Sequence, residues 1–69
     1  MSVQKAIEEM QFLINAYIEL AKQEEVEITL LSGHVVAKGV GNIQAERYIE
    51  LIQACSMAKA ALERLIENE

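Results

Sequence analysis

The chain has 69 residues, a formal net charge of −5, one histidine and one cysteine. This length allows a single domain over residues 1–69, and one cysteine with one histidine provides neither an internal disulfide nor a zinc site. The six basic residues are scattered and no apolar run is long enough to span a membrane, so we expect a cytoplasmic protein without nucleic-acid or membrane partners.

The first block of the sequence predicts an amphipathic helix over about residues 3–22. Its apolar residues recur at alternating steps of four and three, which places them on one stripe: Val3, Ile7, Met10, Ile14, Tyr17 and Ala21. Ala6, Leu13 and Leu20 widen this stripe, and Ser2 can cap the start of the helix.

The next block, VEITLLSGHVVAKGVG, changes to the period of a strand. Apolar and polar residues alternate over 26–30, Ser32-Gly33 interrupts the pattern, and β-branched residues then resume. A two-residue turn at Ser32-Gly33 predicts an antiparallel hairpin with one apolar face and a cross-strand ion pair on the other. The register would pair Leu30 with Val35, Ile28 with Ala37, and Glu27 with Lys38.

The last block predicts a second amphipathic helix from about Asn42 to Ile66, with Asn42 as its N-cap. Steps of three and four again define a stripe: Tyr48, Leu51, Cys55, Ala58, Leu62 and Leu65, broadened by Ile52 and Ile66. Both stripes run for about three heptads, so two chains could form a four-helix bundle.

The predicted fold is therefore α+β in the order α-β-β-α, with two amphipathic helices flanking a β-hairpin. For a monomer of this size, the free energy gained by burial roughly cancels the cost of ordering the chain. Disulfides and metal ions are not available as alternatives, and a lone hairpin is marginal in water. We therefore expect a homo-oligomer, a dimer or larger, with a helix-bundle core.

The stretch AKGVGN, residues 37–42, has two interpretations. Two glycines before a helix start, with cationic side chains nearby, could form a site for a small anion or a nucleotide. The candidate ligand-binding residues would be His34, Lys38, Gly39, Gly41, Asn42 and Arg47. The glycines could instead relieve strain where a strand turns into a helix, and we favour this interpretation because the longer phosphate-binding fingerprints are missing.

No set of residues suggests catalysis, a cofactor or a metal site. His34 follows the predicted turn without an evident nucleophile or orienting acid nearby, and Cys55 lies among apolar neighbours, which is typical of an inert thiol. The sequence therefore predicts a protein that is not an enzyme and needs no cofactor.

Several apolar residues lie off the two stripes, namely Phe12, Ile49 and Met57. They suggest that each helix buries a second face, and we favour subunit contacts over a surface for a foreign partner. The residues expected at interfaces are Phe12, Ile14, Tyr17, Ile49, Met57 and Leu62.

Two functions are compatible with these patterns. The first is a non-enzymatic, homo-oligomeric binding module, a small regulator or inhibitor that acts through protein contacts. The alternative is a protein that sequesters a small anion or nucleotide at the junction of residues 38–42, where subunits meet.

Overall fold

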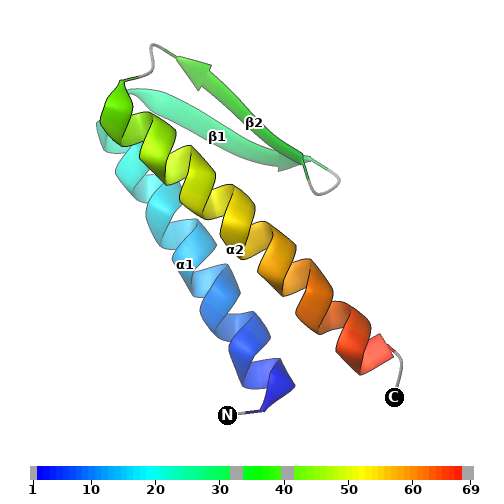
Figure 1. Cartoon of the computed structure of the whole chain (residues 1–69). Coiled ribbons are helices and arrows are strands. Elements are labelled where there is room, and N and C mark those ends of the chain that lie inside the picture. The colour runs from blue at the N-terminus through cyan, green and yellow to red at the C-terminus, as the bar shows by residue number, and fades with distance from the viewer. Residues whose placement is uncertain (1, 32–33, 40–41, 68–69) are drawn as a thin grey trace.

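The computed structural model describes residues 2–31, 34–39 and 42–67. The elements follow in the predicted order: α1 (Val3–Gln23), β1 (Val26–Leu31), β2 (His34–Gly39) and α2 (Ile43–Glu67). In Figure 1 the two helices lie side by side and antiparallel, and the hairpin packs on one face of the pair, beside the ends that connect to it. The order α-β-β-α and the α+β class are thus confirmed.

Helix α1 begins and ends where its side chains can replace missing backbone partners. The Ser2 hydroxyl accepts a hydrogen bond from the Lys5 amide at 3.1 Å, which confirms Ser2 as the N-cap. At the other end, the Glu24 amide donates to the Ala21 carbonyl and the Glu25 amide to the Lys22 carbonyl, each at 3.0 Å. Glu25 then adopts φ 62°, which turns the chain sharply from α1 into β1.

The register of the hairpin is the predicted one, with Leu30 opposite Val35, Ile28 opposite Ala37 and Glu27 opposite Lys38. The turn predicted at Ser32-Gly33 lies outside the described residues. The inner face of β1 is buried, whereas β2 is largely exposed. The expected ion pair between Glu27 and Lys38 is wrong: within the described ranges, the ion pairs all lie on the helices, as Lys5–Glu9, Lys22–Glu19 and Arg47–Glu50.

The core is small and lies near the connected ends of the elements. Its buried members come from all parts of the fold except β2: Ile14, Ala21, Val26, Ile28, Ala45 and Ile52. Ala21 and Ala45 have no exposed surface, and their short side chains let the helices approach closely beside the hairpin. Partly buried side chains of Leu30 and Val35 extend this core into the hairpin.

The side of α2 that faces the core differs from the predicted stripe. That side is centred on Ile52 and includes Ile49, which packs against the core, so the prediction that Ile49 lies off the stripe is wrong. Ala58 and Leu65, which were predicted within the stripe, are exposed. The reason is that the hairpin packs on one side of the helix pair, so the residues of α2 on that side are the ones that become buried.

The chain is thin and elongated, with extents of 43 × 22 × 14 Å and a radius of gyration of 12.9 Å. A compact domain of the same length would have a radius of gyration of about 11 Å. The exposed surface is 5037 Å², whereas a compact monomer of 7.7 kDa would expose about 4,300 Å². In the described part of the chain, neither helix is long and apolar enough to cross a membrane.

Candidate functional site

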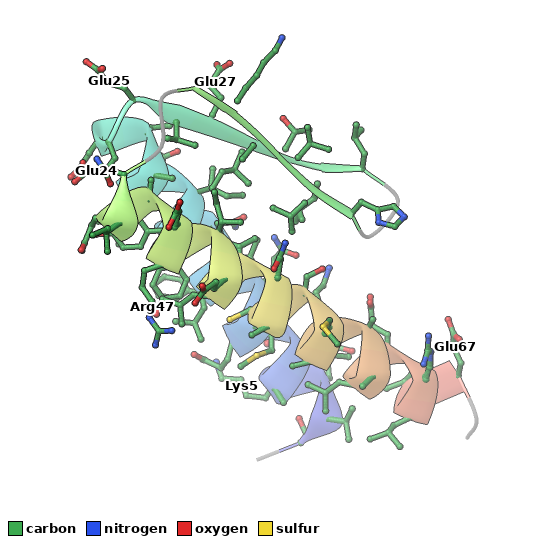
Figure 2. All side chains as sticks on the ribbon, turned by 45° about the horizontal axis from the view of Figure 1, so that its top comes forward. Lys5, Glu24, Glu25, Glu27, Arg47 and Glu67 are labelled. Atoms are coloured by element: carbon green, nitrogen blue, oxygen red, sulfur yellow. The ribbon has the colours of Figure 1, made fainter. Side chains whose placement is uncertain are left out.

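The cations of the predicted anion site do not converge. Lys38 lies opposite Glu27 in the strand register, on the outer face of the hairpin, which points away from the helices. Arg47 lies on the side of α2 away from the hairpin and forms an ion pair with Glu50 at 3.4 Å. Figure 2 shows Glu27 and Arg47 on opposite sides of the molecule, so Lys38 and Arg47 cannot bind the same small anion within one chain.

The start of α2 already has polar partners from its own chain. Asn42 is the predicted N-cap, and its Oδ1 accepts a hydrogen bond from the Ala45 amide at 2.8 Å. Its Nδ2 donates to Oε2 of Glu24 at 3.0 Å, which brings a carboxylate close to the positive end of the helix. An incoming anion would be repelled by this carboxylate, so the geometry here favours a structural cap.

Gly39 has a conformational role that accounts for its presence. Its φ is 133°, which side chains rarely tolerate, and an added Cβ would collide with the Glu25 carbonyl oxygen and lie 3.2 Å from the Val26 Cα. The glycine thus lets β2 end beside the tight turn that leads from α1 into β1. Gly41, the other glycine of the predicted site, lies outside the described residues.

The two side chains considered for catalysis, His34 and Cys55, lie on different elements. His34 is exposed at the start of β2, and Cys55 is half-buried on α2 beside the core. Among the described residues there is no group of three histidine, cysteine or acidic side chains that could hold a metal ion. Among the described residues, the His34 side chain has no hydrogen bond or ion pair to an acid that could orient it as a general base.

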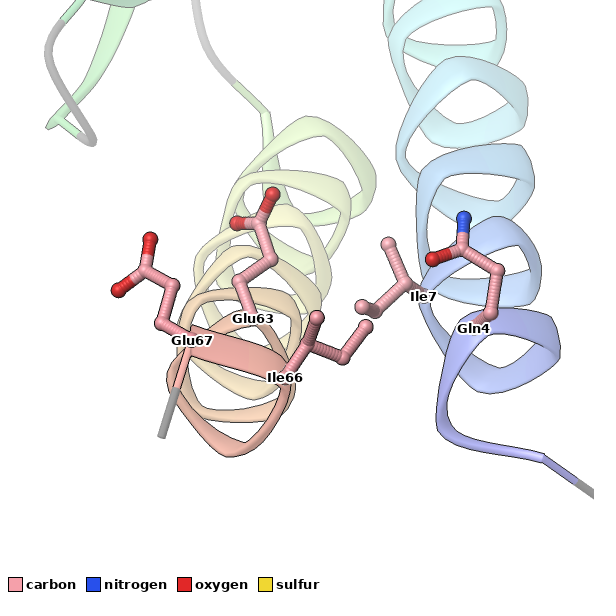
Figure 3. Close-up of a pocket in the computed structure, with 5 residues that line it drawn as sticks. All are labelled: Gln4, Ile7, Glu63, Ile66 and Glu67. Atoms are coloured by element: carbon pink, nitrogen blue, oxygen red, sulfur yellow. The ribbon is translucent and has the colours of Figure 1, made fainter. Parts of the chain in front are cut away.

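A notch of about 250 Å³ opens between the ends of the helices that the hairpin does not reach. Figure 3 shows Ile7 of α1 and Ile66 of α2 pointing towards each other across it, with Gln4 and Glu63 above them and Glu67 directed away. These residues offer two isoleucines and two like-charged carboxylates with no shared partner. The notch therefore lacks the convergent polar groups that fix a small ligand.

The residues predicted at interfaces fall into two groups. Ile14 is 1% exposed and is already covered within the single chain, while Tyr17 packs on the core and stacks on Tyr48 with ring centroids 6.2 Å apart. Phe12 and Met57 are 67% and 74% exposed. At 100° per residue they lie on the outer edges of α1 and α2, pointing away from each other, so they form no common patch.

A second apolar surface lies on the side of the helix pair away from the hairpin, and the helical wheel identifies it. Arg47 lies away from the hairpin in Figure 2 and about 140° round the wheel from Ile52 in one direction, so Ile49, about 60° in the other direction, lies on the hairpin side. Ile18 has the corresponding place on α1, about 40° from Ile14, and both side chains pack against the core.

The apolar residues about 80–120° round the wheel from Ile14 and Ile52, on the side away from the hairpin, define what we call the bare face: Ala6, Leu13 and Leu20 of α1, and Leu51, Ala58 and Leu62 of α2. The uncharged Gln44 lies in the same arc, near the start of α2.

The bare face is only partly covered by its own chain. Leu13, Leu20, Leu51 and Leu62 are half-buried, and Ala58 is exposed. The sequence shows these residues only as a widening of the stripes. The sequence signal that could have identified the bare face is the width of the apolar arc on α1, which is about 160° from Ile18 to Leu20. An arc of this width is more than one packed neighbouring element can cover.

Comparison of the chain with protein-family models, with curated proteins and with solved structures gave no match. The function is therefore inferred from the residues and their arrangement alone.

Proposed function

We propose that the chain is a non-enzymatic, homo-oligomeric binding module, of the kind used by small regulators and inhibitors, and that it acts by holding a protein partner. The observation that carries this proposal is Phe12, a large aromatic side chain that is 67% exposed on the outer edge of α1. Aromatic residues are enriched where partners bind, because they bury a large area at a small cost in conformational entropy.

The surroundings of Phe12 indicate the chemistry of the partner. One turn before it on the helix are Glu8 and Glu9, and two turns after it is Glu19; Glu9 is paired with Lys5, and Glu19 with Lys22. Three carboxylates against two lysines leave this edge of α1 with a net negative charge, and an apolar anchor on such an edge fits a hydrophobic pocket rimmed by lysine or arginine. Binding to such a partner should weaken as salt rises, since rim charges are screened.

We do not extend this proposal to the capture of a small anion or nucleotide at residues 38–42. The cations expected there, Lys38 and Arg47, lie on opposite sides of the chain. The carboxylate of Glu24 approaches the cap residue Asn42 at 3.0 Å, where an anion would have to bind. No observation on the described residues favours that alternative.

The test places a photo-crosslinking amino acid at position 12 of the full chain, in cells that express the protein naturally. The matched control carries the same amino acid at Thr29, which is exposed on the outer face of the hairpin. We expect position 12 to give an adduct with one foreign protein that position 29 does not give. Excess unlabelled chain should suppress this adduct, and excess Phe12→Glu chain should not. Equal adducts at both positions, or adducts with a second copy alone, would contradict the proposal.

A further inference from the structure

We infer that the bare face is covered by the bare face of a second copy, which makes a homodimer whose centre is a four-helix bundle with one hairpin on each outside. This inference deepens the proposed function, because it names the partner and the surface for the self-association that the function includes. Phe12 stays outside the bundle, on the outer edge of α1.

The first argument is architectural. A helix pair that is apolar on both sides needs a covering layer on each side, and the hairpin supplies only one. On the hairpin side, Ile18 and Ile49 pack against Ile14, Ile52 and the strands. On the bare face no further element of the described chain is present. Apolar residues nevertheless recur there at the spacing of a bundle seam, as Leu13 and Leu20 on α1 and as Leu51, Ala58 and Leu62 on α2.

The second argument is the amount of surface left over. The chain exposes 5037 Å², about 700 Å² more than the roughly 4,300 Å² of a compact monomer of this mass. A standard stable interface buries about 800 Å² on each partner. The excess of one copy therefore matches what one side of a dimer interface needs to cover.

The third argument concerns charge, since each copy has a formal net charge of −5 and two copies repel each other. None of the six residues that define the bare face is charged. The nearest charges lie at its rim, where Glu9 is paired with Lys5 and Arg47 with Glu50, each at 3.4 Å. A second copy can thus pack here without burying a charge, whereas a strongly basic partner would find no carboxylate within this face.

The experiment compares two alanines of α2 that are both exposed in the single chain, so that neither substitution removes packing from the monomer. Ala58 lies on the bare face, and Ala61, one turn away, lies on the outer side of the helix. We expect wild type to sediment as a species of twice 7.7 kDa. Ala58→Glu, which would bury two like charges in the dimer, should raise the dissociation constant at least about a hundredfold. Ala61→Glu should change it by less than about threefold.

A second readout uses the single cysteine of the chain, Cys55, which lies beside the bare face on α2 and is half-buried. Its alkylation by iodoacetamide should slow as the wild-type concentration rises, because the dimer covers the thiol. In Ala58→Glu the rate should stay constant over the same range. Circular dichroism is the control that each variant should keep its helices.

A wild type that remains a folded monomer up to millimolar concentration would overturn the dimer. Equal weakening by Ala58→Glu and Ala61→Glu would overturn the assignment of the face, as would a Cys55 alkylation rate that does not depend on concentration. None of these outcomes affects the crosslink at position 12, which tests the foreign partner separately. Conversely, Phe12→Glu should abolish that partner contact and leave the dimer intact.

Discussion

The two ends of the helix pair differ sharply in how well they are packed. In the half near the hairpin, every element except β2 contributes a buried side chain, including Ile14, Ile28 and Ile52. In the free half, which comprises residues 3–11 of α1 and 56–67 of α2, no described residue is buried, and a notch separates Ile7 from Ile66. Both helices continue into the free half, but the hairpin, which covers them in the other half, does not reach it.

This difference shows what a short hairpin can and cannot do for two long helices. Six residues of strand span about 20 Å, whereas the 25 residues of α2 span about 37 Å. The hairpin can therefore complete a core over only part of the helix length, and on one side alone. The stability of the single chain should come mainly from the half near the hairpin, and the following variants test this.

The largest effect is expected from a pair of isoleucine truncations, one in each half. Ile52 is fully buried and Ile7 is half-buried, so Ile52→Ala should cost about 3–4 kcal/mol of unfolding free energy and Ile7→Ala about 1–2 kcal/mol. Urea denaturation followed by circular dichroism measures both. Equal losses would show that the free half is packed as tightly as the other in solution.

The next effect concerns the close approach of the hairpin to the end of α1. Gly39→Ala should cost about 2 kcal/mol, because φ is 133° and the new Cβ would collide with the Glu25 carbonyl oxygen. Val36→Ala on the same strand is the control. Val36 is 44% exposed, and its truncation should cost less than about 1 kcal/mol. A smaller loss for Gly39→Ala than for the control would mean that the turn can relax.

The two helix caps give a smaller contrast between the halves. Asn42 caps α2 and also binds Glu24, a residue 18 positions away, whereas Ser2 only caps α1 at the free end. Asn42→Ala should therefore cost about 1–2 kcal/mol and Ser2→Ala about 0.5 kcal/mol. The double variant Asn42→Ala with Glu24→Ala separates the cap from the link. If Ser2→Ala proved the more costly, the free end would be contributing more than its packing indicates.

The smallest effect is a gain in stability at the turn between α1 and β1. Glu25 has φ 62°, a conformation that glycine adopts without strain, so Glu25→Gly should raise the unfolding free energy by about 0.5–1 kcal/mol. Glu24→Gly is the control and should lower stability, because Glu24 has φ −96° and its carboxylate accepts from Asn42. The melting temperatures of the two variants should therefore move in opposite directions. A decrease for Glu25→Gly would assign its side chain a stabilising contact.

Sequence alone determined the features of this protein that depend on neighbours along the chain. The caps at Ser2 and Asn42 and the pairing of Leu30 with Val35 follow from local hydrogen bonding and from a two-residue period, and all of them are found in the structure. The sides of the helices required the tertiary structure. Periodicity gives α2 a broad apolar surface but does not say which part of it meets the hairpin.

Only the docking of the hairpin decided that Ile49 packs on the core, that Ala58 stays exposed, and that Lys38 and Arg47 point to opposite sides. The physical reason is that the hydrophobic effect depends on the apolar area buried and not on direction. Two apolar residues 100° apart on a helix are therefore equally good candidates for the core until another element covers one of them.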